Sequence, residues 1–158
     1  IRLGLYSAFI PGRLEIIHKE PLVILDGAHN PDKMKALVGS IKKIFPKKKV
    51  TSIVAIKNDK NAKDMLSLLL KISEKVIFTK FQLKGDVGII TSYDPKELFT
   101  ISQIIQQQRY ASRHTNVVKE LSVVGNVEKA LEEAIKSAKP DDLILITGSL
   151  YLVGEISN

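Results

Sequence analysis

The stretch LVILDGAHNP, residues 22–31, constrains the fold more than any other part of the sequence. Its first four residues are apolar and indicate a strand that is buried on both faces, as in a parallel sheet. Asp26 ends this strand, and Asn30 with Pro31 suits the cap and the first position of a helix. A strand that leads through a polar turn into a helix is the repeating unit of α/β folds, so we expect such a fold here.

The same turn contains the first candidate functional residues. Open α/β sheets bind ligands at the carboxyl ends of their strands, and Asp26, His29 and Asn30 occupy such an end. A purely structural interpretation is also available, in which Asp26 and Asn30 cap backbone N–H groups and His29 is a surface residue. The turn alone does not favour either interpretation.

The rest of the chain alternates between strand and helix patterns. The expected strands cover residues 14–18, 22–25, 50–56, 76–79, 121–124 and 143–147. The expected helices cover residues 31–45, 62–72, 95–108 and 127–138, with a short last helix after residues 148–149. Residues 80–93 fit no single pattern, and residues 109–119 are expected to form a loop. This order predicts a Rossmann-like, mostly parallel sheet with helices on both faces.

Length and composition favour one domain of a cytoplasmic protein. A chain of 158 residues with 44% hydrophobic residues can form a single core, and the absence of cysteine excludes disulfides and thiolate metal sites. No apolar run reaches the roughly 18 residues of a membrane span, and no signal peptide is evident. The chain does not begin with Met, so we expect a piece of a longer protein. Residues 1–12 are interpreted as the tail of an interdomain linker and residues 13–158 as the domain.

The net charge of +7 predicts a solvated lysine surface rather than a nucleic-acid site. Only 6% of the residues are aromatic, which leaves few side chains to stack on bases. A basic surface of this kind can still attract polyphosphate substrates.

Phosphate-binding loops are missing from the sequence. It contains neither G-x-x-x-x-G-K-[ST] nor, after a strand, G-x-G-x-x-G. An ATP-using enzyme built from this chain must therefore take its phosphate loop from elsewhere.

Two further residues have chemistry suited to anions. Arg13 follows Pro11 and Gly12, and its guanidinium could bind a phosphate through two hydrogen bonds, although an exposed arginine is the simpler interpretation. Ser149 opens the last helix, where free N–H groups attract a carboxylate, and it could also be only the helix cap. The spacing of the histidines at 18, 29 and 114 indicates no metal site.

Three motifs, PGRLE at 11–15, LDGAHNP at 25–31 and ITGSLYLVGE at 146–155, resemble the C-terminal domain of folylpolyglutamate synthase/dihydrofolate synthase, in the Mur ligase superfamily. The resemblance covers nearly the whole chain, and the motifs stand in the family's order. It implies the Mur ligase C-terminal type of fold in a monomeric protein. A central ATPase domain with the P-loop would precede this domain, and the active site would lie in the cleft between the two.

The same resemblance implies roles for individual residues. Arg13 and Asp26 match the residues that contact ATP, and His29 and Ser149 match residues near the incoming glutamate, with His29 as the catalytic candidate. Supporting roles would fall to Asn30, Asp59, Lys60 and Gly148. The loop at 57–60 departs from the family because the glycine that often precedes its Asp-Lys pair is absent, and the 86–93 segment departs as well.

The implied reaction is the ATP-dependent addition of L-glutamate to a carboxylate of folate or dihydropteroate through an acyl phosphate. Mg²⁺ would be held mainly by the central ATPase domain, and the fragment alone would be inactive. Two alternatives remain: a free-standing Rossmann-like module that binds a nucleotide or a protein, and another Mur ligase that joins an amino acid to a cell-wall precursor. The sequence does not separate dihydrofolate synthase from folylpolyglutamate synthase activity.

Overall fold

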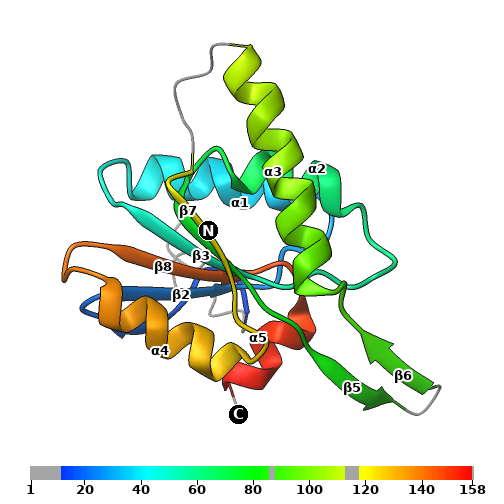
Figure 1. Cartoon of the computed structure of the whole chain (residues 1–158). Coiled ribbons are helices and arrows are strands. Elements are labelled where there is room, and N and C mark those ends of the chain that lie inside the picture. Colours follow the sequence, from blue (N-terminus) through cyan, green and yellow to red (C-terminus); the bar gives the residue numbers. More distant parts are fainter. Residues whose placement is uncertain (1–11, 86–87, 113–117, 158) are drawn as a thin grey trace, which may run out of the picture.

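The computed structural model of this chain describes residues 12–85, 88–112 and 118–157 (Figure 1). The expected linker tail, apart from Gly12, and His114 lie outside the described residues. In chain order the elements are β1 (Glu15–Lys19), β2 (Leu22–Asp26), α1 (Pro31–Ile44), β3 (Val50–Val54), α2 (Ala62–Leu69), β4 (Ser73–Phe78), β5 (Gln82–Gly85), β6 (Gly88–Thr91), α3 (Pro95–Ala111), β7 (Glu120–Val123), α4 (Val127–Ser137), β8 (Leu143–Thr147) and α5 (Leu150–Ser157).

The main sheet has six strands in the order β1-β2-β8-β3-β4-β7, and only β1 runs antiparallel to its neighbour. This arrangement confirms the predicted α/β class with a mostly parallel sheet. The register pairs Thr147 of β8 with Asp26 of β2 on one side and with Val54 of β3 on the other. The carboxyl ends of three central strands therefore lie at one level, at one edge of the sheet.

Helices cover both faces of the sheet, as predicted (Figure 1). The connections from β2 through β3 and β4 to β7 all advance in one direction across the sheet, and α1, α2 and α3 lie on one face. The chain then returns from β7 to β8, and because such crossovers are right-handed, α4 lies on the opposite face beside α5. The reversal of direction separates β2 from β3 and places β8 between them.

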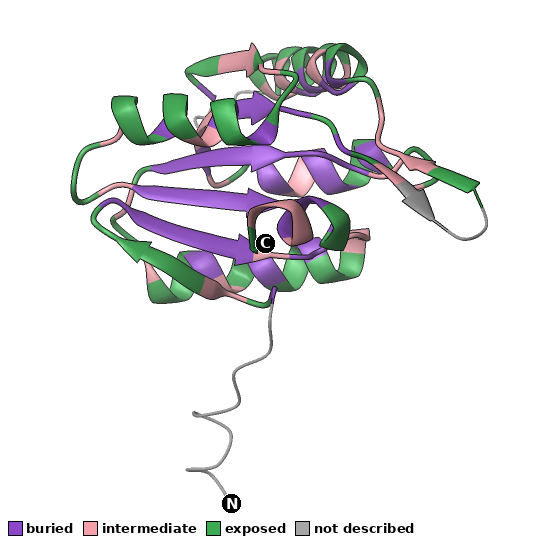
Figure 2. Cartoon of the chain, turned by 90° about the horizontal axis from the view of Figure 1, so that it is seen from below, coloured by how far each residue is buried: buried purple, intermediate pink, exposed green. Residues whose placement is uncertain are grey.

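Each face of the sheet has its own apolar core. Leu22 and Ile24 of β2 pack with α1, whereas Val23 and Leu25 pack on the side of α4 and α5. All five residues of β8 are fully buried, which agrees with its central position (Figure 2). Two-sided burial explains why these strands read as continuous apolar runs rather than as alternating patterns.

Side-chain caps begin α1, α3 and α4, and that of Asn30 stands where the sequence predicts it. The side chains of Asn30, Asp94 and Asn126 each accept a hydrogen bond from a backbone N–H in the first turn of the helix that follows. In contrast, α3 continues to Ala111, three residues beyond its expected end at Gln108, because residues 109–111 contain no glycine or proline to stop it.

Residues 80–93, which the sequence left unassigned, contain a two-stranded antiparallel ribbon of β5 and β6. This ribbon extends away from the body of the domain, next to the base of α3 (Figure 1). Its base is tied to the loop after β3, where the Asn58 N–H donates to the Thr91 carbonyl at 3.2 Å. The residues of β6 are exposed or half-buried, unlike those of the central strands, so the segment shows no clear periodic apolar pattern.

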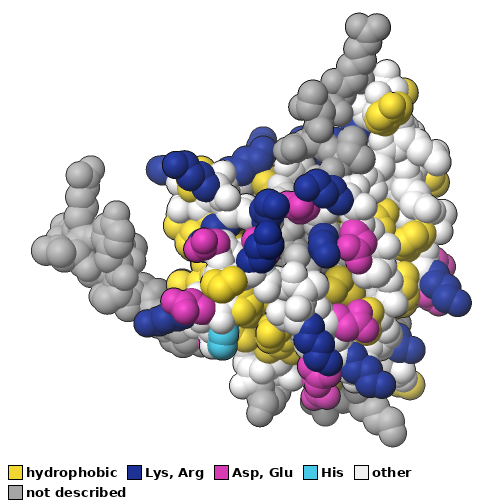
Figure 3. Space-filling model, turned by 60° about the vertical axis from the view of Figure 1, so that its left-hand side comes forward, with side chains coloured by type: hydrophobic (Ala, Val, Ile, Leu, Met, Phe, Trp, Pro, Cys, Tyr) yellow, Lys and Arg dark blue, Asp and Glu magenta, His cyan; other side chains and the backbone are white. Residues whose placement is uncertain are grey.

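Lysines on the surface are interspersed with acidic side chains, as Figure 3 shows for one face. Glu74 contacts Lys49 at 3.9 Å and Lys119 at 2.7 Å, and Lys75 contacts Glu120 at 3.0 Å. Exposed pairs of this kind contribute about 0–1 kcal/mol each. Within the described residues, no helix is both long and apolar enough to cross a membrane.

Candidate functional site

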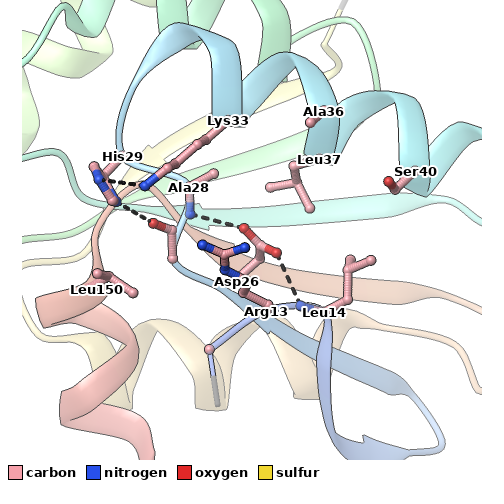
Figure 4. Close-up of a pocket in the computed structure, with 12 residues that line it drawn as sticks. Arg13, Leu14, Asp26, Ala28, His29, Lys33, Ala36, Leu37, Ser40 and Leu150 are labelled. Carbon is pink, nitrogen blue, oxygen red and sulfur yellow. Dashed lines mark hydrogen bonds between the residues drawn. The ribbon is translucent and has the colours of Figure 1, made fainter. Parts of the chain in front are cut away.

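A pocket of about 260 Å³ lies at the carboxyl end of β2. It is bounded by the loop at residues 12–14, the turn at residues 26–29, the side of α1 and the first residue of α5 (Figure 4). Its polar side chains are those of Arg13, Asp26, His29, Lys33 and Ser40. This is the edge of the sheet at which open α/β folds bind ligands.

Asp26 joins two segments of the pocket wall. One carboxylate oxygen accepts a hydrogen bond from the Leu14 N–H at 3.1 Å, and the other accepts one from the Ala28 N–H at 2.9 Å (Figure 4). Burial raises the pKa of Asp26 above its usual value, and the two N–H donors and the charge of Arg13 oppose that rise only in part. The carboxylate therefore has a structural function, whether or not it also contacts a ligand.

The loop that carries Arg13 is held in an unusual backbone conformation. Gly12 has a φ of 70° and Leu14 a φ of 45°, and the second value is uncommon for a residue with a branched side chain. The Gly12 N–H donates to the Glu15 carboxylate at 2.8 Å, and the Gly12 carbonyl accepts from the Gly27 N–H at 2.7 Å. These hydrogen bonds fix the loop against β2, so that the exposed Arg13 side chain lines the pocket.

Two glycines allow close packing around the pocket. A Cβ atom on Gly27 would lie 2.2 Å from Cδ2 of Leu150, the first residue of α5. A Cβ atom on Gly148 would lie 2.5 Å from the Ala55 carbonyl oxygen, and Gly148 has a φ of 105°. The turn after β8 can therefore pass directly over the end of β3 only with glycine at this position.

His29 uses both ring nitrogens. Nδ1 lies 2.8 Å from the Gly27 carbonyl oxygen, and Nε2 lies 3.0 Å from the Lys33 ammonium (Figure 4). Asn30 accepts a hydrogen bond from the Lys33 N–H at 2.9 Å through its side chain and so caps α1. The structural interpretation of Asn30 is thus confirmed, and its supporting role toward a ligand stays a prediction.

Ser149 is placed differently from His29. It is 2% exposed, and its hydroxyl oxygen accepts a hydrogen bond from the Tyr151 N–H at 3.1 Å, which makes it a cap of α5. Neither Gly148 nor Ser149 is among the residues that line the pocket, and the side chain of Leu150 occupies that side of the wall. The structure brings together Arg13, Asp26 and His29 in the pocket wall, and Ser149 is buried outside this wall.

Asp59 and Lys60 lie in the loop after β3, at the same sheet edge but outside the pocket wall. Asp59 is 2.8 Å from the Lys57 ammonium and 3.9 Å from that of Lys60. The hydrogen bond from Lys57 lowers the pKa of the Asp59 carboxyl. The Lys60 carbonyl accepts from the Tyr93 hydroxyl at 3.1 Å, so this loop is held against the segment that precedes α3.

Sequence reasoning missed Lys33, Leu14 and Leu150 as parts of the pocket wall. Lys33 could have been found, since a lysine in the first turn of a helix opposes the helix dipole and stands four residues after His29. Leu150 could not, because its place depends on how the turn after β8 packs against Gly27.

The chemistry of the pocket suits an anionic oxygen group, because Arg13 and Lys33 are exposed cations and Asp26 is the single carboxylate among the described lining residues. In the part of the chain that the structure describes, no group of three or more His, Asp or Glu side chains could hold a metal ion.

Known proteins resemble this chain over nearly its whole length. Residues 13–158 match the family model described as dihydrofolate synthetase, C-terminal domain. The chain is 32% identical over 155 residues to a probable bifunctional folylpolyglutamate synthase/dihydropteroate synthase of Haloferax volcanii, covering 98% of this chain and 16% of that protein. It is 29% identical over 160 residues to the UDP-N-acetylmuramoyl-L-alanyl-D-glutamate–2,6-diaminopimelate ligase of Buchnera aphidicola, covering 100% of this chain and 29% of that protein.

Among solved structures, the fold matches that of a bifunctional folylpolyglutamate synthase/dihydrofolate synthase with Mn, AMPPNP and L-glutamate bound. The TM-score is 0.73 at 24% identity, over 98% of this chain and 32% of that one. This chain therefore spans about a third or less of the length of the proteins it resembles. The match over residues 13–158 shows that the chain belongs to the dihydrofolate synthetase C-terminal domain family.

Proposed function

We propose that this chain is the C-terminal part of an ATP-dependent ligase that adds L-glutamate to a carboxylate of folate or dihydropteroate. Membership of the dihydrofolate synthetase C-terminal domain family over residues 13–158 is the observation that carries this proposal. The positively charged pocket at the end of β2 supports it, because both ATP and glutamate present anionic oxygens.

The reaction joins a carboxylate to an amine in two steps. The γ-phosphoryl group of ATP moves to a carboxylate oxygen, which gives an acyl phosphate and ADP. The amino group of glutamate then attacks the acyl carbon, inorganic phosphate leaves with the C–O bond electrons, and the nitrogen loses a proton. Phosphorylation is needed because a free carboxylate has no good leaving group.

Nucleotide contact is assigned to Arg13 and Asp26. The exposed guanidinium of Arg13 can donate two hydrogen bonds to a phosphate or ribose oxygen. Each Asp26 oxygen already accepts one backbone N–H and retains capacity to accept another hydrogen bond. The same carboxylate that holds the Arg13 loop in place would thus contact the nucleotide.

Glutamate contact is assigned to His29 and Ser149, with His29 nearest the reacting amine. Asn30, Asp59, Lys60 and Gly148 would support the site by holding its loops, which agrees with the hydrogen bonds that Asn30 and Lys60 make. Because Ser149 is buried and does not line the pocket, its contribution to glutamate binding would go through the helix end that it caps.

A preceding ATPase domain is proposed as the partner that supplies the phosphate loop and most of the Mg²⁺ ligands. The cation would polarise the transferred phosphoryl group, and we assign no step to it within this chain. Closure of the two domains would exclude water from the acyl phosphate. We further propose that the complete protein is a cytoplasmic monomer.

The test is a ligation assay on the full-length protein with ATP, L-glutamate, and dihydropteroate or tetrahydrofolate, read out by phosphate release and product mass. We expect Arg13→Ala and Asp26→Ala to lower kcat/KM by about tenfold or more, since each removes a hydrogen bond to a charged group. Asp141→Ala, an exposed carboxylate before β8, is the matched control and should not change the rate. Normal turnover in both pocket variants would contradict the assigned site.

A cell-wall ligase is a second candidate, and the 29% identity to the Buchnera aphidicola ligase favours it. The same assay separates the two when the folate is replaced by a UDP-linked acyl substrate and glutamate by diaminopimelate. Turnover only with the second pair would replace the folate assignment. ATP binding without turnover for any pair would favour a binding module.

A further inference from the structure

Lys33 is a pocket cation that takes no part in the proposed contacts to ATP or glutamate. Its side chain is exposed in the first turn of α1, and its ammonium lies 3.0 Å from Nε2 of His29 (Figure 4). Among the described residues, no carboxylate forms an ion pair with it. The Lys33 ammonium therefore contacts an imidazole nitrogen and not an acidic partner.

This contact defines the protonation pattern of the His29 ring. The Gly27 carbonyl can only accept a hydrogen bond, so Nδ1 must carry the hydrogen. The Lys33 ammonium can only donate, so Nε2 must present its lone pair. In this arrangement Nδ1 donates to the Gly27 carbonyl, and Lys33 covers the nitrogen that would otherwise face a ligand.

The position of Lys33 is electrostatically unfavourable without an anion. The N-terminus of a helix has partial positive charge, so lysine is disfavoured in the first turn. Arg13 adds a second positive charge to the same pocket, and the one lining carboxylate among the described residues, Asp26, forms no ion pair with Lys33. Asp32 is the acidic residue of this turn, but it is not among the residues that line the pocket.

We propose that Lys33 binds an anionic oxygen group of a substrate and that it moves from Nε2 of His29 to that group when the substrate enters. The anion is a nucleotide phosphate or the carboxylate of the amino-acid substrate, and this identity rests on the proposed function. The exchange frees Nε2 of His29 to accept a hydrogen bond from the bound ligand. Lys33 is thereby a binding residue, and it also positions His29.

The kinetic test uses the full-length protein with Lys33→Met, Lys33→Arg and, as a matched control, Lys35→Met. Lys35 is exposed on the same helix and lies outside the pocket wall, so it loses the same charge at a neighbouring place. We expect Lys33→Met to raise one KM about tenfold, which corresponds to one charged hydrogen bond, and Lys33→Arg to restore most of the loss. A raised KM for ATP identifies the phosphate, and a raised KM for glutamate identifies the carboxylate. Equal kinetics for Lys33→Met and Lys35→Met would overturn the inference while leaving the ligase assignment intact.

A second readout does not depend on turnover. In protein with ¹⁵N-labelled histidine, the Nε2 resonance of His29 should have the shift of a hydrogen-bonded acceptor, and Lys33→Met should move it toward that of a free acceptor. Adding inorganic pyrophosphate or L-glutamate should move the wild-type resonance and leave that of Lys33→Met in place. If the wild type performs no ligation, the proposed function fails, and the Nε2 resonance alone then tests whether Lys33 binds an anion. An Nε2 resonance that ignores both the substitution and the added anions would refute the inference.

Discussion

At the scale of single residues, glycine positions set how closely the turns around the pocket can pack. Gly148 combines a φ of 105° with an Ala55 carbonyl oxygen that would lie 2.5 Å from a Cβ atom. We expect Gly148→Ala to lower the free energy of unfolding by about 2 kcal/mol or more, because backbone must move to accept the methyl group. Urea unfolding of the purified chain measures the change.

Gly39 provides the control for that substitution. It lies within α1, is exposed, and a Cβ atom there would meet nothing within 4 Å. Gly39→Ala should therefore raise the free energy of unfolding by up to ~1 kcal/mol through helix propensity. If Gly148→Ala and Gly39→Ala changed the free energy of unfolding in the same direction, the turn at Gly148 would not lie as close to β3 as described.

Asp26 should make stability depend on pH in an unusual direction for a carboxylate. Burial raises its pKa above the unfolded value, so the folded protein binds the proton more readily than the unfolded chain. This contribution stabilises the fold below the unfolded pKa and is lost as the pH rises through the raised folded pKa.

The measurement compares wild type with Asp26→Asn across about pH 3 to 7, a range that spans the usual aspartate pKa and values above it. The free energy of unfolding of the wild type, taken relative to that of the variant, should increase as the pH falls. Other titrating groups are common to both proteins and cancel in the difference. A difference that decreases on acidification would mean that the pKa of Asp26 is lowered.

At the scale of elements, α1 depends on its cap. Asn30 accepts a hydrogen bond from the Lys33 N–H, and its loss leaves a first-turn donor without its partner. We expect Asn30→Ala to lower the free energy of unfolding by about 1 kcal/mol, and Asn30→Asp to preserve most of it. Thermal unfolding of the wild type and the two variants tests this. An Asn30→Ala variant as stable as the wild type would mean that the Asn30 cap does not stabilise α1.

Elements with strong local signals could be predicted from sequence. The strand at residues 22–26, the caps at Asn30 and Asn126, and the apolar strand at residues 143–147 follow from patterns within a few residues of each other. The end of a strand is harder to predict where burial continues beyond it. The sequence predicts a strand over residues 50–56, but β3 ends at Val54, although Ala55 and Ile56 are fully buried. A run of apolar residues indicates that a segment is buried, but it does not indicate where its hydrogen bonds to the neighbouring strands end.

The candidate site could be predicted only in part, for a physical reason. Asp26 and His29 lie within one turn, so their neighbourhood follows from local sequence. The close approach of Gly27 to Leu150 depends on the register of β2 against β8. That register joins residues more than a hundred positions apart, and no short pattern encodes it.

At the scale of the whole molecule, the chain should need its proposed partner domain. We expect residues 1–158 alone to give no ATP-dependent ligation with any folate, since the sequence has no phosphate loop of the P-loop type. Phosphate release assays on the fragment and on the full-length protein measure the contrast. Sustained turnover by the fragment would contradict the division of the site between two domains.

The central position of β8 also has a consequence for the synthesis of this protein. Until residues 143–147 leave the ribosome, β2 and β3 have no strand between them, and the two halves of the main sheet cannot join. Contacts this distant in sequence form late and slowly. A nascent chain that stops before β8 would expose the apolar edges of both halves, so that premature termination leaves a substrate for chaperones and proteases instead of a folded domain.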